Sequence, residues 1–228
     1  MGVNNSSRCV VKPVFDALEA SGKIICFLRM VLPSSFAKVN SIQMFYEGHP
    51  KERVFRPRPE FLDWCRANPE ALVNPELARK CLKKNPLYVF EGGTHPDIFI
   101  ETPCCNVVIE AKWTEPRITA HTTWRKEGER DQLLRHMDAL TAFNVKDCEK
   151  PTFGLFLIDA NGKISRDIVD SLFAEDWYYK RSLPHRVSNG SWRVIKDNYR
   201  GVFTWQELVD FVGLKVKGCR LLGTSLVE

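Results

Sequence analysis

The chain has 228 residues and a mass of 26.2 kDa, and its 33 lysine and arginine residues against 28 aspartate and glutamate residues give a formal net charge of +5. Hydrophobic residues make up 44% and charged residues 27%, which is typical of a globular protein and argues against extended disorder and against a coiled coil. The longest apolar stretch, residues 24–32, is too short to span a bilayer and contains Arg29, and residues 1–12 lack the apolar region of a signal peptide. We therefore expect a cytoplasmic protein that has no membrane partner and keeps its eight cysteines reduced.

The N-terminal third of the sequence has few clear structural signals. Residues 14–32 have helical periodicity that a Ser-Gly pair interrupts, and residues 48–59 are charged and punctuated by proline, which predicts a loop. We expect residues 1–59 to form an appendage to a domain of residues 60–228. A single domain of residues 1–228 is the alternative.

Helices and strands follow one another more clearly after this point. A helix is expected from Glu60, and Pro75 occupies a position that often opens another helix. Three short β-prone runs come next, then a long amphipathic stretch at helical spacing, and then an apolar run that predicts a buried strand: residues 87–90, 97–100, 107–113, 123–143 and 152–158. The expected order is therefore helix, three strands, helix, strand.

The C-terminal part has weaker signals of the same kind. Ser165 is a candidate N-cap of a helix, and residues 192–195 resemble a short strand. Thr204 and Glu207 have the spacing of a capping box, which predicts a further helix after Thr204.

Two acidic residues and one lysine stand on neighbouring strands of the expected sheet. Residues two apart on a strand point to the same face, so Glu110 and Lys112 project together. The alternating residues point the other way into apolar packing: Ile109, Ala111 and Trp113. A hairpin between the second and third strands would fold Asp97 back beside Glu110. Carboxylates at close range repel unless a cation lies between them, and hard oxygen ligands favour Mg²⁺ or Mn²⁺. The pattern therefore predicts a divalent-metal site, in which the lysine can orient a water that attacks a phosphodiester.

The sequences Pro96-Asp97 and Glu110-Ala111-Lys112, on strands in this order, resemble the PD-(D/E)xK nuclease superfamily over about a third of the chain. The resemblance implies the restriction-endonuclease-like fold, an α/β protein with a three-layer α/β/α core around a central mixed β-sheet. It also implies that Asp97, Glu110 and the backbone carbonyl of Ala111 hold the metal, and that Lys112 assists the attacking water. On this basis we expect a nuclease that hydrolyses DNA phosphodiester bonds with Mg²⁺ or Mn²⁺, an endonuclease of restriction, repair or mobile-element type, with a homodimer as the expected assembly.

Further candidates follow from the same resemblance. Gln132 matches the glutamine of a Gln-x-x-x-Tyr element that exonuclease-like members carry after the lysine, and His136 stands in the place of the tyrosine. Glu91 is the first candidate for an additional metal-binding acid, ahead of Glu60 and Glu76. Four basic residues on the expected helix are candidates for contacts with the phosphates of nucleic acid: Arg125, Lys126, Arg130 and Arg135.

Two alternatives stay open on the sequence alone. Glu110 and Lys112 can form a surface ion pair on an ordinary hairpin, and the four basic residues can belong to a solvated helix surface. The chain can also be a non-catalytic nucleic-acid-binding or interaction protein on the same fold, although such a protein has no physical need to keep Asp97, Glu110 and Lys112 together. A group of tyrosines and basic residues between positions 178 and 186 suits a mixture of core and surface better than a nucleic-acid contact.

Overall fold

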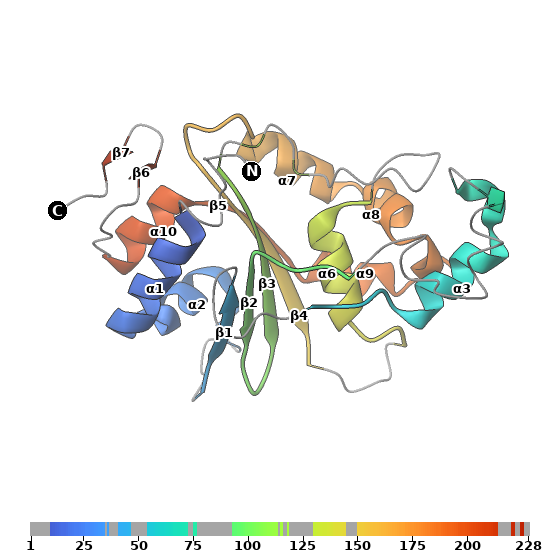
Figure 1. The fold of residues 1–228 in the computed structure, drawn as a ribbon, viewed down its shortest axis with the longest axis horizontal. Coiled ribbons are helices and arrows are strands. Elements are labelled where there is room, and N and C mark those ends of the chain that lie inside the picture. The colour runs from blue at the N-terminus through green and yellow to red at the C-terminus, as the bar shows by residue number, and fades with distance from the viewer. Residues whose placement is uncertain are drawn as a thin grey trace.

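A five-stranded mixed sheet forms the centre of the protein (Figure 1). The computed structural model describes residues 10–34, 36, 41–46, 54–72, 75–76, 93–113, 115, 118, 130–144, 150–213, 220–221 and 224–225. The strands lie side by side in chain order: β1 (Gln43–Tyr46), β2 (Ile98–Glu101), β3 (Asn106–Lys112), β4 (Thr152–Ile158) and β5 (Tyr199–Thr204). The first three strands are antiparallel neighbours, whereas β3, β4 and β5 run parallel.

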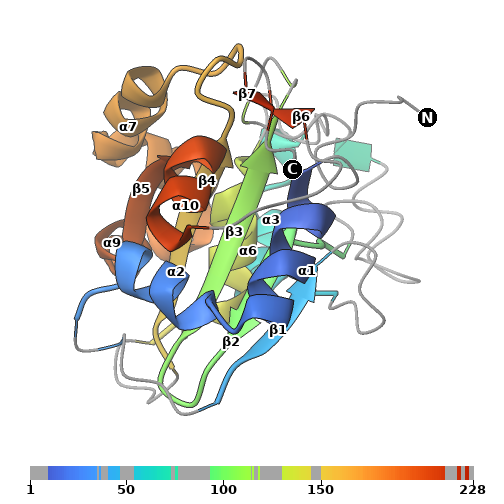
Figure 2. The ribbon, with the colours of Figure 1, turned by 90° about the vertical axis from the view of Figure 1, so that its left-hand side faces the viewer.

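Helices cover both faces of this sheet, which gives three layers (Figure 2). One face is covered by α1 (Lys12–Ser21), α2 (Ile24–Val31) and α10 (Trp205–Val212). The other face is covered by α6 (Gln132–Leu140), α7 (Arg166–Ala174), α8 (Asp176–Ser182) and α9 (Trp192–Asp197). The remaining short elements are α3 (Pro59–Ala67), the 3₁₀ turns Pro69–Ala71 and Pro184–Arg186, and a small hairpin of β6 (Arg220–Leu221) and β7 (Thr224–Ser225). The expected α/β class with a three-layer core and a mixed sheet is therefore confirmed at this level.

The alternation of side chains on β3 explains how the two cores arise. Val107, Ile109 and Ala111 are fully buried against α1, α2 and α10, while Val108 is buried in the core on the opposite face. The next two residues on the face of Val108 are Glu110 and Lys112, so the polar pair points toward the layer that contains α6. Every residue of β4 is buried, as expected for a central parallel strand.

The N-terminal region is part of this core, and the expectation that residues 1–59 form an appendage is wrong for the part that the structure describes. Strand β1 extends the sheet by pairing with β2, with Met44 opposite Ile100 and Tyr46 opposite Ile98. Helices α1 and α2 bury their apolar residues against the same sheet. The first of the three antiparallel strands is therefore β1, and the run at residues 87–90 lies outside the described residues.

Several predicted helix boundaries are confirmed. The interruption in the first helical region is Gly22, which takes a left-handed conformation with φ of 66° and ends α1. Helix α3 begins at Pro59, Ser165 precedes the first residue of α7, and Thr204 and Glu207 form both hydrogen bonds of a capping box. No helix in the described ranges has the length and apolar character needed to cross a membrane.

Three sequence predictions need correction or fall at least partly outside the described residues. Residues 192–195 are not a strand but the start of α9, because Trp192 and Ile195 are three positions apart and both bury on one side of a helix. The long helix expected over residues 123–143 is described only as α6, from Gln132 to Leu140. Most of the helix expected from Pro75 also lies outside the described residues.

Candidate active site

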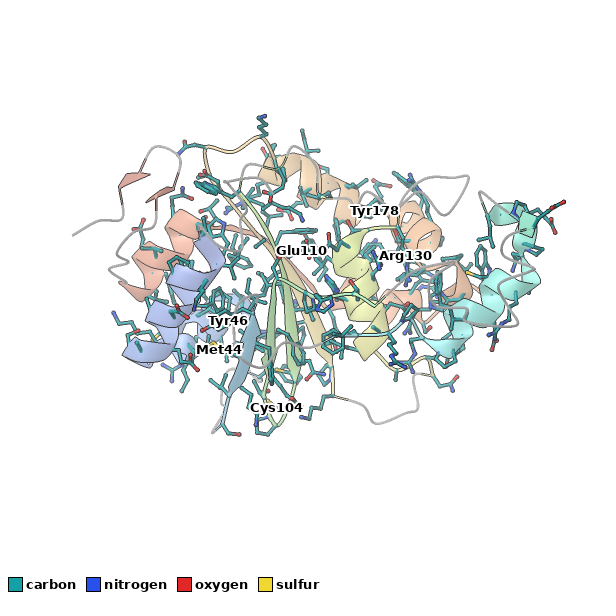
Figure 3. All side chains as sticks on the ribbon, in the orientation of Figure 1. Met44, Tyr46, Cys104, Glu110, Arg130 and Tyr178 are labelled. Carbon is teal, nitrogen blue, oxygen red and sulfur yellow. The ribbon has the colours of Figure 1, made fainter. Side chains whose placement is uncertain are left out.

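The β2–β3 ladder brings the two acidic residues to the same point. Ile98 pairs with Ile109, so the next step of the antiparallel register sets Asp97 opposite Glu110. Asp97 is two residues before Phe99, which belongs to the core on the α6 side of the sheet. Asp97 thus lies beside Glu110, as expected for a hairpin, and both carboxyl groups project toward α6. Figure 3 shows Glu110 between the sheet and that helix.

Hydrogen bonds hold this group of three side chains together. The backbone amide of Ala111 donates to Oδ2 of Asp97 at 2.8 Å, and Nζ of Lys112 donates to Oε1 of Glu110 at 2.5 Å. The side chains of Asp97 and Glu110 also lie close enough for each to shift the pKa of the other. The side chain of Glu110 is 1% exposed and that of Lys112 is 11% exposed. The predicted ion pair between them therefore forms, but it is buried and not part of a solvated surface.

Burial raises the pKa of both acids. The pKa of Asp97 is well above its usual value because the group is desolvated and because the charge of Glu110 lies close to it. Burial also raises the pKa of Glu110, although Lys112 opposes this effect. Burial alone would lower the pKa of Lys112, but the two acids outweigh it and raise that pKa above its usual value. Burial of both acids and their closeness to each other therefore favour the protonated forms of these carboxyl groups.

Helix α6 adds two more titratable residues to the same region. Asp131 is the N-cap of α6, where its carboxylate accepts hydrogen bonds from the amide of Leu134 and the hydroxyl of Tyr178, both at 2.9 Å. Burial raises the pKa of Asp131 to about 6, with a further contribution from the charge of Glu110. One turn later, Nε2 of His136 lies 3.2 Å from Oε2 of Glu110.

Helix α6 packs tightly on the sheet at a glycine of the neighbouring strand. A Cβ atom on Gly154 of β4 would overlap the sulfur of Met137, so the methionine side chain fills the space that a larger residue on β4 would take. Met137 directly follows His136 in α6. The tight packing at Gly154 therefore lies next to the residue whose imidazole contacts Glu110.

The other predicted site residues have different surroundings. Gln132 is half-buried at the first position of α6. It lies four residues before His136 and thus on the same face of the helix, and its catalytic role stays a prediction. Arg135 is buried, and its charge lowers the pKa of Glu110. Glu60 lies in α3, where Arg58 donates to it. Of the remaining candidates, Glu76 belongs to an isolated described pair, residues 75–76. Three others lie outside the described residues: Glu91, Arg125 and Lys126.

Arg130 is not a surface contact for nucleic acid, which corrects the prediction. Its side chain is 1% exposed and forms an ion pair with Asp138, and its Nε donates to the carbonyl of Ser182 at 2.7 Å. Asp138 also accepts hydrogen bonds from His185 and Arg186. Figure 3 shows Arg130 beside α6 and α8, so this buried network joins the helices of one layer.

The group between positions 178 and 186 is mostly core, as the sequence indicated. Tyr178, Tyr179, His185 and Arg186 are buried, whereas the side chain of Lys180 is 46% exposed. Ring contacts among Phe173, Tyr178 and Tyr179 fill the core between α7 and α8.

The donor set fits a hard divalent cation. Within the described residues, no group of three or more histidine, cysteine, aspartate or glutamate side chains is arranged to hold a metal. Mg²⁺ commonly uses only one or two carboxylates, and water and other oxygens complete its coordination. Asp97 and Glu110 provide two such carboxylates at one point. Burial raises the pKa of both, and a bound cation would offset the unfavourable free energy of ionising them there.

Comparisons with known proteins assign no family. No protein-family model matches the chain, and no solved structure matches it. Over 95 residues, which are 40% of this chain, the sequence is 32% identical to lovastatin diketide synthase lovF of Aspergillus terreus. The matched segment is 4% of the length of that synthase. The likeness is thus confined to a small part of a much larger protein.

Proposed function

We propose that this protein is a metal-dependent nuclease that hydrolyses phosphodiester bonds of DNA at Asp97, Glu110 and Lys112. The observation that carries the proposal is the convergence of two buried carboxyl groups, both with raised pKa, beside a lysine on one central strand. The pKa values of both acids stay raised although Lys112 lies beside them, and a second cation would offset the remaining cost of burying the two acids together. Clusters of this kind are typical of functional sites.

Each residue has a distinct task in the proposed reaction. Asp97, Glu110 and the carbonyl of Ala111 would hold Mg²⁺ or Mn²⁺, which polarises a phosphoryl oxygen and lowers the pKa of a bound water when present. The Ala111 amide fixes the orientation of Asp97, and Lys112 fixes one oxygen of Glu110. The ammonium group of Lys112 lies beside the acids, where it can orient the attacking water and stabilise negative charge that develops on the phosphate.

The element order around the three residues supports a restriction-endonuclease-like core, and an endonuclease that cuts two strands would act as a homodimer in the cytoplasm. The second candidate function is a non-catalytic nucleic-acid-binding or interaction protein. It requires no metal and gives no reason for burying Asp97 beside Glu110.

A cleavage assay separates the two candidates. The purified protein should nick or cut plasmid DNA in Mg²⁺ or Mn²⁺, lose this activity in EDTA, and lose it in the Glu110→Gln variant. The matched control is Glu101→Gln, which removes a half-exposed carboxylate from the neighbouring strand β2 and should cleave like the wild type. Equal cleavage by wild type and Glu110→Gln, or cleavage that persists in EDTA, would contradict the proposal.

A further inference from the structure

His136 links the candidate active site to a second segment of the chain. Its imidazole is fully buried, with Nε2 3.2 Å from Oε2 of Glu110 and Nδ1 3.0 Å from Oγ1 of Thr94. Thr94 is held in turn by two backbone hydrogen bonds with Phe55, at 2.8 and 2.9 Å. A series of hydrogen bonds therefore connects the backbone of Phe55 and Thr94, through His136, to Oε2 of Glu110.

These contacts bear on which ring nitrogen of His136 carries the proton that is donated to Glu110. A neutral imidazole has one donor and one acceptor nitrogen, and the tautomer is set by the partner of the other nitrogen. The Thr94 hydroxyl can donate to Nδ1, which leaves the proton on Nε2 for the Glu110 carboxylate. Both oxygens of Glu110 then accept a hydrogen bond, Oε1 from Lys112 and Oε2 from His136.

We propose that His136 is a positioning residue, which holds the carboxylate of Glu110 in the orientation that binds a divalent cation, and that Thr94 fixes the tautomer of His136. The inference rests on the proposed function, because it concerns the same metal site. His136 acts through Glu110, since its ring is fully buried and its Nε2 already faces that carboxylate. Hydrogen-bond partners of metal ligands typically contribute 10-fold to 100-fold to metal affinity or activity.

Two substitutions at this position distinguish positioning from simple packing. The amide nitrogen of His136→Gln can reach the place of Nε2 and keep the donor to Glu110. His136→Asn reaches only the place of Nδ1, so it keeps a polar contact with Thr94 and loses the donor to Glu110. Both variants put a polar amide into the same buried site, so a general packing defect should affect both.

The readout is the affinity for Mn²⁺ alone, measured by the electron paramagnetic resonance signal of the free ion, together with single-turnover cleavage of DNA. We expect His136→Asn to weaken Mn²⁺ binding and slow cleavage by about 10-fold to 100-fold, and His136→Gln to stay within about threefold of the wild type. Equal losses in the two variants, or wild-type affinity in His136→Asn, would overturn the inference.

Thr94 provides a second test that does not change the imidazole. Thr94→Val removes the hydroxyl at nearly constant volume and should weaken Mn²⁺ binding about threefold to tenfold, whereas Thr94→Ser should bind like the wild type. This pair decides the question if the His136 variants melt too early to assay, and equal Mn²⁺ affinity in the two Thr94 variants would then overturn the inference. If the wild type binds Mn²⁺ and cleaves but the variants match it, only the positioning role fails. If the wild type itself neither binds Mn²⁺ nor cleaves, the proposed function fails and the positioning role fails with it.

Discussion

The backbone amide of Ala111 donates a hydrogen bond to Oδ2 of Asp97 at 2.8 Å, so the acid of one strand is held by the middle residue of the Glu-x-Lys triplet on the next. This bond fixes the Asp97 carboxyl beside that of Glu110, although the pKa of each is raised by burial and the two groups repel when ionised. The sheet thus maintains an arrangement that is unfavourable without a cation.

The first prediction separates catalysis from folding. Asp97→Asn and Glu110→Gln should each reduce cleavage at least about 100-fold, the scale of removing one positioned catalytic group. In metal-free buffer at neutral pH, neither variant should melt below the wild type, because a carboxyl whose pKa is raised by folding opposes folding when ionised. Thermal melts with EDTA check this, and a large fall in melting temperature for both variants would make the acids structural.

The second prediction concerns the shape of the cation at position 112. Lys112→Arg keeps the positive charge but replaces a compact ammonium by a broad guanidinium that would displace the attacking water. Cleavage should fall about 100-fold or more, while DNA binding in Ca²⁺ should stay near the wild-type value because the charge is unchanged. Lys180→Arg is the control on an exposed lysine and should change neither quantity. Wild-type cleavage by Lys112→Arg would remove this lysine from the mechanism.

The third prediction uses the pH dependence of stability. Folding raises the pKa of Asp131 from 3.8 to about 6, so the folded chain binds a proton more tightly and ionisation destabilises it as the pH rises from about 4 to about 6. Asp131→Asn keeps the helix cap and should increase the free energy of unfolding at pH 7.5 by up to about 3 kcal/mol, at about 1.4 kcal/mol for each pKa unit.

Urea unfolding at several pH values measures this difference. The gain should shrink as the pH falls through 6 and vanish near pH 4, where the carboxyl is protonated in both the folded and the unfolded chain. A gain that is the same at pH 4 and pH 7.5 would contradict the assignment of a raised pKa to Asp131.

The fourth prediction tests the reassignment of Arg130. Removing the charge of Asp138 leaves Arg130 and Arg186 buried without their shared carboxylate, so Asp138→Asn should reduce the free energy of unfolding by about 3–5 kcal/mol. Asp63→Asn, which breaks an exposed ion pair with Arg66, should have almost no effect in the same urea titration. Similar small effects in both variants would argue against a structural role for this network.

The sequence predicted the parts of the site that depend on local geometry. Alternation along β3 determines that Glu110 and Lys112 share a face, and the hairpin with β2 determines that Asp97 meets Glu110. Both inferences need only the two-residue period of a strand and a short turn. The same reasoning recognised β4 as a buried strand from its apolar run.

Contacts between distant segments were beyond sequence reasoning. The contact between His136 and Glu110 joins α6 to β3, and the packing of Met137 on Gly154 joins α6 to β4, and nothing in the helix sequence itself signals either contact. In the sequence, Arg130 is a basic residue on an expected helix, which suggests a phosphate contact. In the folded chain it is buried in a network with Asp138, His185 and Arg186. Strand β1 has only four residues, too few for a clear alternation pattern.

The most direct test of the metal site is the position of Mn²⁺ in crystals of the protein, located by its anomalous scattering. The account predicts a peak between the carboxylates of Asp97 and Glu110, at about 2.1 Å from an oxygen of each, the distance typical of Mg²⁺ sites. No peak at this position at millimolar Mn²⁺, with the Ala111 amide still bonded to Asp97 and Lys112 still bonded to Glu110, would contradict the proposed metal-dependent nuclease.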